Sequence, residues 1–210
     1  MSPPINDPEV LAFIAKVDRL TPPGRAARSI VEQRELYDAM SDAFREPRPD
    51  GIEVRDHKIA GTPCRRYGGD GYIRIIFLHG GGFVVGGLES HDDVAAEIAA
   101  STGLPVDAVD YRLAPENPHP AAFEDALTVA RASAGPLILV GDSAGGTLAA
   151  SVAWRLRETE RIAAQVLIYP SLGGETLGLP SYTECADAPL LTTADLDAYR
   201  DMRGGGSSAS

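Results

Sequence analysis

The segment Gly141-Asp142-Ser143-Ala144-Gly145-Gly146 contains a serine in the pattern Gly-x-Ser-x-Gly. The apolar run at residues 136–140 before it predicts a buried parallel strand, and residues 147–158 after it predict a helix. A sharp turn from strand to helix needs small residues, because larger side chains would clash, and it raises the serine hydroxyl clear of the sheet. It also puts backbone N–H groups at a helix N-terminus. Ser143 is therefore a candidate nucleophile, although an ordinary glycine turn would also explain this pattern taken alone.

A second stretch of small residues, His79-Gly80-Gly81-Gly82-Phe83, follows a predicted strand at residues 72–78. Successive glycines leave the backbone N–H groups unobstructed. Such donors can stabilise the negative oxygen of a tetrahedral intermediate, in the arrangement called an oxyanion hole. A flexible loop would also explain this stretch on its own. Because both stretches occur in order and each follows a predicted strand, we favour acyl-transfer chemistry over coincidence.

These two segments, together with Asp110-Tyr111-Arg112-Leu113-Ala114-Pro115-Glu116, resemble esterases of the hormone-sensitive-lipase-like branch of the α/β-hydrolase superfamily. A weaker similarity lies at residues 187–191, and the resemblance covers most of the chain from about Arg65 onward. It implies hydrolysis of short-chain carboxylic esters through a serine nucleophile and an acyl-enzyme.

The resemblance also assigns roles to residues of the two glycine-containing segments. It implies that Ser143 is the nucleophile and that the N–H groups of Gly81, Gly82 and Ala144 form the oxyanion hole. His79 is expected to brace the glycine loop and not to act as the base. The expected partner is therefore a small-molecule ester.

Strands that alternate with helices predict an α/β fold, with a mostly parallel sheet covered by helices on both faces. Strands are expected at residues 52–60, 62–67, 72–78, 106–111, 136–140 and 165–170, and helices at 8–20, 25–44, 123–132 and 147–158. A capping box at residues 90–93 is expected to begin a further helix that continues to about Ala100. The expected domains are N-terminal cap helices, 1–46, and a partial α/β-hydrolase core, 47–210, whose last strands and helices are missing.

The sequence contains no obvious base for the serine. In α/β-hydrolases the catalytic partners follow the serine in the order acid, then histidine. The four histidines, however, all precede Ser143: His57, His79, His91 and His119. Acids do follow it, but none has a recognisable catalytic context: Glu175, Glu184, Asp187, Asp195 and Asp197.

Three explanations remain open. The chain is the N-terminal part of an esterase whose acid and histidine lie outside it, a non-catalytic receptor-like binder, or an enzyme that recruits His91 as its base. We favour the first, because it also explains the missing final strands. It predicts that residues 166–169 form an apolar sheet edge, which would pair with a complementary C-terminal segment or a second copy.

Composition excludes several other classes of protein. The 210 residues suffice for one domain, and the formal net charge of -11 argues against nucleic acid or an anionic membrane as partners. Cys64 and Cys185 indicate no disulfide framework, and the histidine spacing suggests no zinc site, so no metal or cofactor is expected. With no apparent secretory signal and no apolar run of membrane-spanning length, a cytoplasmic location is expected.

Four other polar residues are expected to be structural. Arg112 and Glu116 are expected to form a buried ion pair behind the site. Asp142, although adjacent to the candidate nucleophile, is expected to point elsewhere, since neighbouring residues of a sharp turn face different ways. His57 is expected at the surface.

Overall fold

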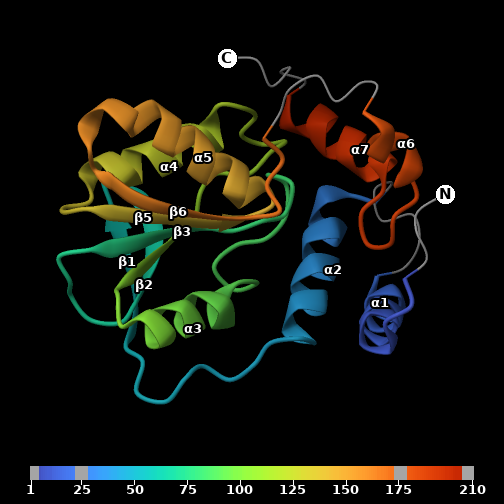
Figure 1. The fold of residues 1–210 in the computed structure, drawn as a ribbon, viewed down its shortest axis with the longest axis horizontal. Coiled ribbons are helices and arrows are strands. Elements are labelled where there is room, and N and C mark those ends of the chain that lie inside the picture. The colour runs from blue at the N-terminus through green and yellow to red at the C-terminus, as the bar shows by residue number, and fades with distance from the viewer. Residues whose placement is uncertain (1–4, 22–27, 173–178, 205–210) are drawn as a thin grey trace.

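The computed structural model describes residues 5–21, 28–172 and 179–204 (Figure 1). The described residues form a six-stranded sheet in the order β1-β2-β4-β3-β5-β6. The pairs β3–β4, β3–β5 and β5–β6 are parallel, whereas β1–β2 and β2–β4 are antiparallel. The strands are β1 Val54–Ile59, β2 Thr62–Tyr67, β3 Arg74–Leu78, β4 Val106–Val109, β5 Leu137–Asp142 and β6 Ile162–Ile168. The predicted mostly parallel sheet is therefore confirmed.

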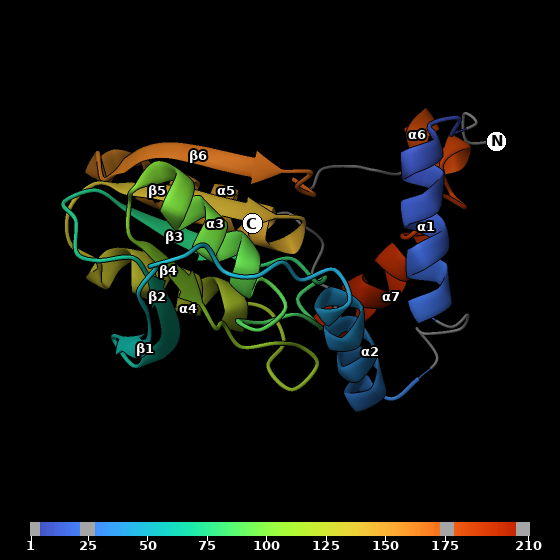
Figure 2. The same ribbon diagram turned by 90° about the horizontal axis from the view of Figure 1, so that it is seen from below.

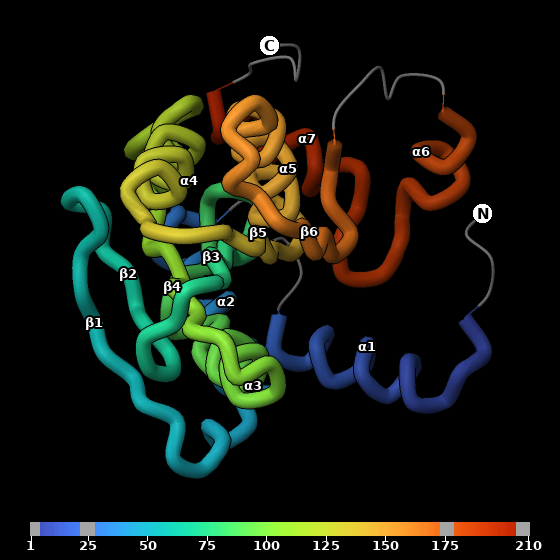
Figure 3. Tube along the Cα trace, turned by 60° about the vertical axis from the view of Figure 1, so that its left-hand side comes forward, coloured from blue at the N-terminus to red at the C-terminus, as the bar shows by residue number. Residues whose placement is uncertain are grey.

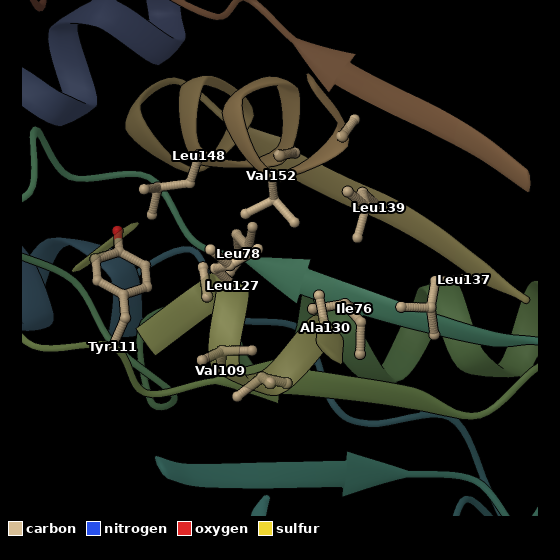
Figure 4. Packing of buried hydrophobic residues seen from close by; sticks show 14 of the residues in the cluster. Ile76, Leu78, Val109, Tyr111, Leu127, Ala130, Leu137, Leu139, Leu148 and Val152 are labelled. Atoms are coloured by element: carbon tan, nitrogen blue, oxygen red, sulfur yellow. The ribbon is translucent and has the colours of Figure 1, made fainter. Parts of the chain in front are cut away.

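Helices cover both faces of this sheet, as expected. In Figure 1, α4 (Ala121–Ala132) and α5 (Ala144–Leu156) lie on one side and α3 (Asp92–Thr102) lies on the other. Successive side chains of a strand point to opposite faces. Ile76 and Leu78 accordingly pack with α4 and α5 (Figure 4), whereas Ile75 and Phe77 pack against α3. Burial on both faces explains why β3 reads as a continuous apolar run.

Four further helices lie beyond the carboxyl ends of the parallel strands (Figure 2). They are α1 Pro8–Leu20, α2 Ile30–Asp42, α6 Pro180–Glu184 and α7 Thr193–Arg203. The bounds of α1 match the predicted helix, but Phe13 on its apolar face is 45% exposed, and only Val17 of that face is buried. The two C-terminal helices were not predicted, because their short apolar patterns are weak.

Two helix starts differ from the predictions. α2 begins at Ile30, where Ser29 and Glu32 form a capping box, and residues 25–27 of the predicted helix lie outside the described residues. The capping box predicted at residues 90–93 is wrong. His91 is the N-cap of α3 and makes no side-chain cap, while the Ser90 hydroxyl accepts from Gly87 N–H at 2.9 Å.

β6 lies at one end of the sheet (Figure 3), where its outer side pairs with no strand among the described residues. Val166 and Ile168 are 48% and 38% exposed. The predicted apolar edge is therefore confirmed, and such an edge is a template for pairing with another strand. No helix in the described part of the chain is long and apolar enough to span a membrane.

Candidate active site

Ser143 lies at the junction between β5 and α5. Its backbone has φ 50° and ψ -117°, which is strained for a residue other than glycine. The helix begins at Ala144 and not at residue 147 as predicted, so the turn is sharper than expected. The flanking glycines are required because the backbones touch. A Cβ on Gly141 would lie 2.4 Å from the Gly145 carbonyl carbon, and one on Gly145 would lie 1.8 Å from the Leu78 carbonyl oxygen.

The glycine loop follows β3. Gly81 and Gly82 have positive φ, 114° and 62°, and a Cβ on Gly81 would lie 2.1 Å from the Val85 carbonyl oxygen. The Gly81 carbonyl accepts from the N–H groups of Val84 and Val85, each at 3.0 Å. Within residues 28–172, no acceptor is recorded for the N–H groups of Gly81, Gly82 or Ala144. These are the three donors that the sequence analysis expected to bind an oxyanion.

His79 packs against this loop and is buried. Its Nδ1 lies 2.6 Å from the Gly80 carbonyl oxygen, and its ring stacks on Tyr111 with centroids 4.2 Å apart. The Tyr111 hydroxyl donates to the His79 carbonyl at 2.7 Å. Burial lowers the pKa of His79 to about 3, with a smaller contribution from His91. The ring is therefore neutral near neutral pH, and the tautomer with its proton on Nδ1 donates to the Gly80 carbonyl.

Asp142 connects the two glycine-containing segments. Its Oδ1 accepts from Gly80 N–H at 2.9 Å and lies 3.6 Å from His91 Nε2. Burial alone would raise the pKa of Asp142, but the nearby His91 ring and the Gly80 N–H donor outweigh burial and lower it. The Asp142 side chain is thus directed into the glycine loop, as expected for a structural residue.

None of the described side chains forms a recorded hydrogen bond with the Ser143 hydroxyl. His91 was the candidate for a recruited base, but its Nδ1 lies 2.8 Å from Ser90 Oγ and its Nε2 faces Asp142. Its ring packs among Tyr37, Phe77 and His79. In this structure His91 therefore contacts residues that position the glycine loop, and not the Ser143 hydroxyl. Of the downstream acids considered, Glu175 lies outside the described residues.

Another sequence expectation is wrong. Arg112 and Glu116 do not pair with each other. Arg112 Nε binds Asp125 Oδ2 at 2.9 Å, and Glu116 Oε2 binds Arg34 Nη2 at 2.7 Å. The local motif could not reveal these partners, which come from other segments.

His57 lies on the edge strand β1 with 26% of its side chain exposed, as expected for a surface position, but it also has a buried partner. Its Nε2 lies 2.9 Å from Oδ1 of the fully buried Asp107. Asp107 also binds Arg66 Nη2 at 2.6 Å. The contact follows from the antiparallel pairing of β1, β2 and β4, which brings distant residues together across the sheet.

Helices α2 and α7 contribute residues that the sequence analysis missed. A Cβ on Gly82 would lie 2.7 Å from Cγ of Tyr199, so this ring lies directly on the glycine loop. Beside it is a cavity of about 20 Å³, which is room for about one water molecule. Its lining comes from Thr21, Gln33, Leu36, Tyr37, Met40, Val85 and Tyr199. The helical pattern gave no sign of which side chains would reach the loop.

Comparisons with known proteins identify the family of this fold. Residues 75–209 match a family model described as alpha/beta hydrolase fold. Esterase LipI of Mycobacterium tuberculosis is 42% identical over 137 residues, which cover 60% of this chain and 42% of that protein. Carboxylesterase NlhH of the same species is 34% identical over 192 residues, which cover 85% of this chain and 55% of that protein. The chain thus spans about half the length of these curated relatives.

Solved structures show the same likeness. A crystal structure of an esterase from the bacterial hormone-sensitive lipase family superposes with a TM-score of 0.82 at 28% identity, covering 99% of this chain and 72% of that one. The crystal structure of DphMB1 superposes with a TM-score of 0.80 at 34% identity, and the match covers 97% of this chain and 70% of that one. The chain therefore belongs to the α/β-hydrolase fold family, in its hormone-sensitive-lipase-like esterase branch.

Proposed function

We propose that this chain forms the nucleophile and oxyanion half of a serine carboxylesterase for short-chain acyl esters. The observation that carries the proposal is the strained Ser143 at the start of α5, beside a glycine loop whose N–H groups have no recorded acceptor in residues 28–172. The names of the relatives, esterase and carboxylesterase, support the reaction class.

In the proposed reaction, Ser143 Oγ attacks the ester carbonyl carbon and loses its proton to a base. The N–H groups of Gly81, Gly82 and Ala144 hold the oxyanion, and one such donor typically contributes about 3 kcal/mol to the transition state. The tetrahedral intermediate then expels the alcohol, which takes the proton back from the base. Water releases the carboxylic acid from the acyl-enzyme in the same way.

The supporting residues act through the glycine loop in this proposal. His79 and Asp142 hold Gly80 at both of its backbone polar groups, His79 at the carbonyl and Asp142 at the N–H. Because no described histidine binds the Ser143 hydroxyl, the base and its orienting acid come from outside this chain. A serine hydroxyl without a base is a weak nucleophile. The chain alone should therefore turn over esters very slowly.

Hydrolysis of p-nitrophenyl acetate and butyrate tests this proposal. We would compare the chain alone with a fusion to the part of esterase LipI that continues beyond the matched region. The fusion should show rapid turnover that Ser143→Ala abolishes, with ligand binding retained. Rapid turnover by the chain alone would instead indicate a base within it. Tight binding of esters without turnover in either protein would favour the receptor-like alternative.

The exposed edge of β6 supports a second part of the proposal. A complementary C-terminal segment, or a second copy of the chain, would pair with this edge and cover Val166 and Ile168. Light scattering should then show self-association of the chain alone, which the LipI fusion suppresses. A monodisperse monomer at high concentration would count against pairing between copies.

A further inference from the structure

Arg34 connects α2 to the segment that follows the glycine loop. Its Nε donates to the Val84 carbonyl at 2.9 Å, and its Nη2 donates to the Ala114 carbonyl at 3.0 Å. The same guanidinium binds both carboxylate oxygens of Glu116, at 3.0 and 2.7 Å. One side chain therefore joins three parts of the chain that are far apart in sequence.

The Val84 carbonyl belongs to the turn that shapes the glycine loop. The N–H groups of Val84 and Val85 both donate to the Gly81 carbonyl, and Ala114 N–H donates to the Phe83 carbonyl at 2.8 Å. The next carbonyl, that of Val84, accepts from the Arg34 side chain on α2. Movement of the Val84 peptide would therefore disturb the bonds that fix Gly81.

Apolar packing between α2 and the segment after the glycine loop fixes the position of the Arg34 contacts. Ile30 and Tyr37, on the same face of α2 as Arg34, pack with the buried Val84 and Val85. Glu116 is 54% exposed, and an ion pair this exposed adds little by its charge alone. The specific contribution of Arg34 comes from its planar guanidinium, which donates to the Val84 and Ala114 carbonyls and to the Glu116 carboxylate at the same time. A lysine at this position would retain the charge but not the planar group.

We propose that Arg34 is a positioning residue that couples the docking of α2 to the shape of the oxyanion loop. This inference rests on the proposed function, because the loop acts in catalysis only if Ser143 is the nucleophile. An oxyanion hole acts in the transition state. Displacement of the loop should therefore lower kcat and leave KM nearly unchanged.

The test uses the 210-residue chain with Arg34→Lys and Arg34→Met. Arg45→Met is the matched control, since Arg45 follows α2 and donates to the Glu89 carbonyl but does not touch the glycine loop. Residue-resolved amide hydrogen exchange reports directly on the Val84, Val85 and Ala114 N–H groups. Acylation of Ser143 by p-nitrophenyl acetate, followed by intact mass, reports on the site.

Both Arg34 variants should exchange these three amides about tenfold faster than the parent chain, with the core amides of β3 and β5 unchanged. The maximal acylation rate should fall about tenfold, less than the loss of a whole oxyanion donor. Arg45→Met should change neither quantity. Full protection in Arg34→Lys, or equal loosening in Arg45→Met, would overturn the proposal. The chain alone lacks the base and should acylate slowly, so if no acylation of the parent chain is detected, the rates are measured in the LipI fusion. Failure of that fusion to acylate would contradict the proposed function, whereas the exchange result still decides the role of Arg34.

Discussion

Gly145→Ala tests whether close backbone contact explains the glycine after the candidate nucleophile. Gly145 is the second residue of α5, where the helix passes the end of β3. An added methyl carbon would lie 1.8 Å from the Leu78 carbonyl oxygen and 2.6 Å from the His79 carbonyl oxygen. Both are backbone atoms, so neither can rotate away as a flexible side chain would.

Two effects with opposite signs decide the result. Alanine is favoured over glycine in a helix by about 1 kcal/mol, which predicts stabilisation. Overpacking a close-packed site costs about 1–3 kcal/mol and occasionally more. The contacts at Gly145 are far shorter than real Cβ contacts, so the upper end of that range applies. The net expectation is a loss of about 2 kcal/mol or more in the free energy of unfolding.

Two other glycines provide a graded control. A methyl at Gly146 would lie 3.0 Å from the Gly141 carbonyl oxygen, and a methyl at Gly69 would meet no atom within 4 Å. Urea unfolding followed by far-UV circular dichroism should therefore rank the losses as Gly145→Ala, then Gly146→Ala, then Gly69→Ala. A Gly145→Ala protein as stable as its parent, or more stable, would show that helix propensity dominates. The account of the sharp turn would then be wrong.

Two further predictions concern buried charge. His79 has a pKa near 3 in the folded state and stays neutral there, whereas in the unfolded chain it is protonated below about pH 6.5. The free energy of unfolding should therefore decrease as the pH is lowered from about 6.5 to about 3. Urea unfolding at several pH values should show a component of up to about 1.4 kcal/mol per pH unit that His79→Gln removes, and an unchanged slope would refute the assignment. Asp107→Asn removes the buried carboxylate that pairs with the buried Arg66 and should cost about 3–5 kcal/mol. Asp70→Asn, at a side chain 85% exposed that also pairs with Arg66, should cost much less, and equal losses would contradict the burial argument.

The sequence alone determined the features that depend on local backbone geometry. The strand, the turn at Ser143 and the following helix were predictable, because tight turns and close backbone contacts leave room only for glycine at Gly141 and Gly145. The apolar runs predicted β3 and β5 for a similar reason, since a parallel strand inside a sheet is buried on both faces. Only the ends of these elements shifted by a few residues.

The tertiary structure alone decided which distant side chains meet. Arg34 and Glu116 are 82 residues apart, and the motif around Glu116 suggested Arg112 in place of the actual partner. Tyr199 reaches Gly82 because α7 folds back over the carboxyl ends of the strands (Figure 1). The physical reason is that a charged or aromatic side chain is compatible with many partners. Its choice among them depends on which segments the packed core brings within reach.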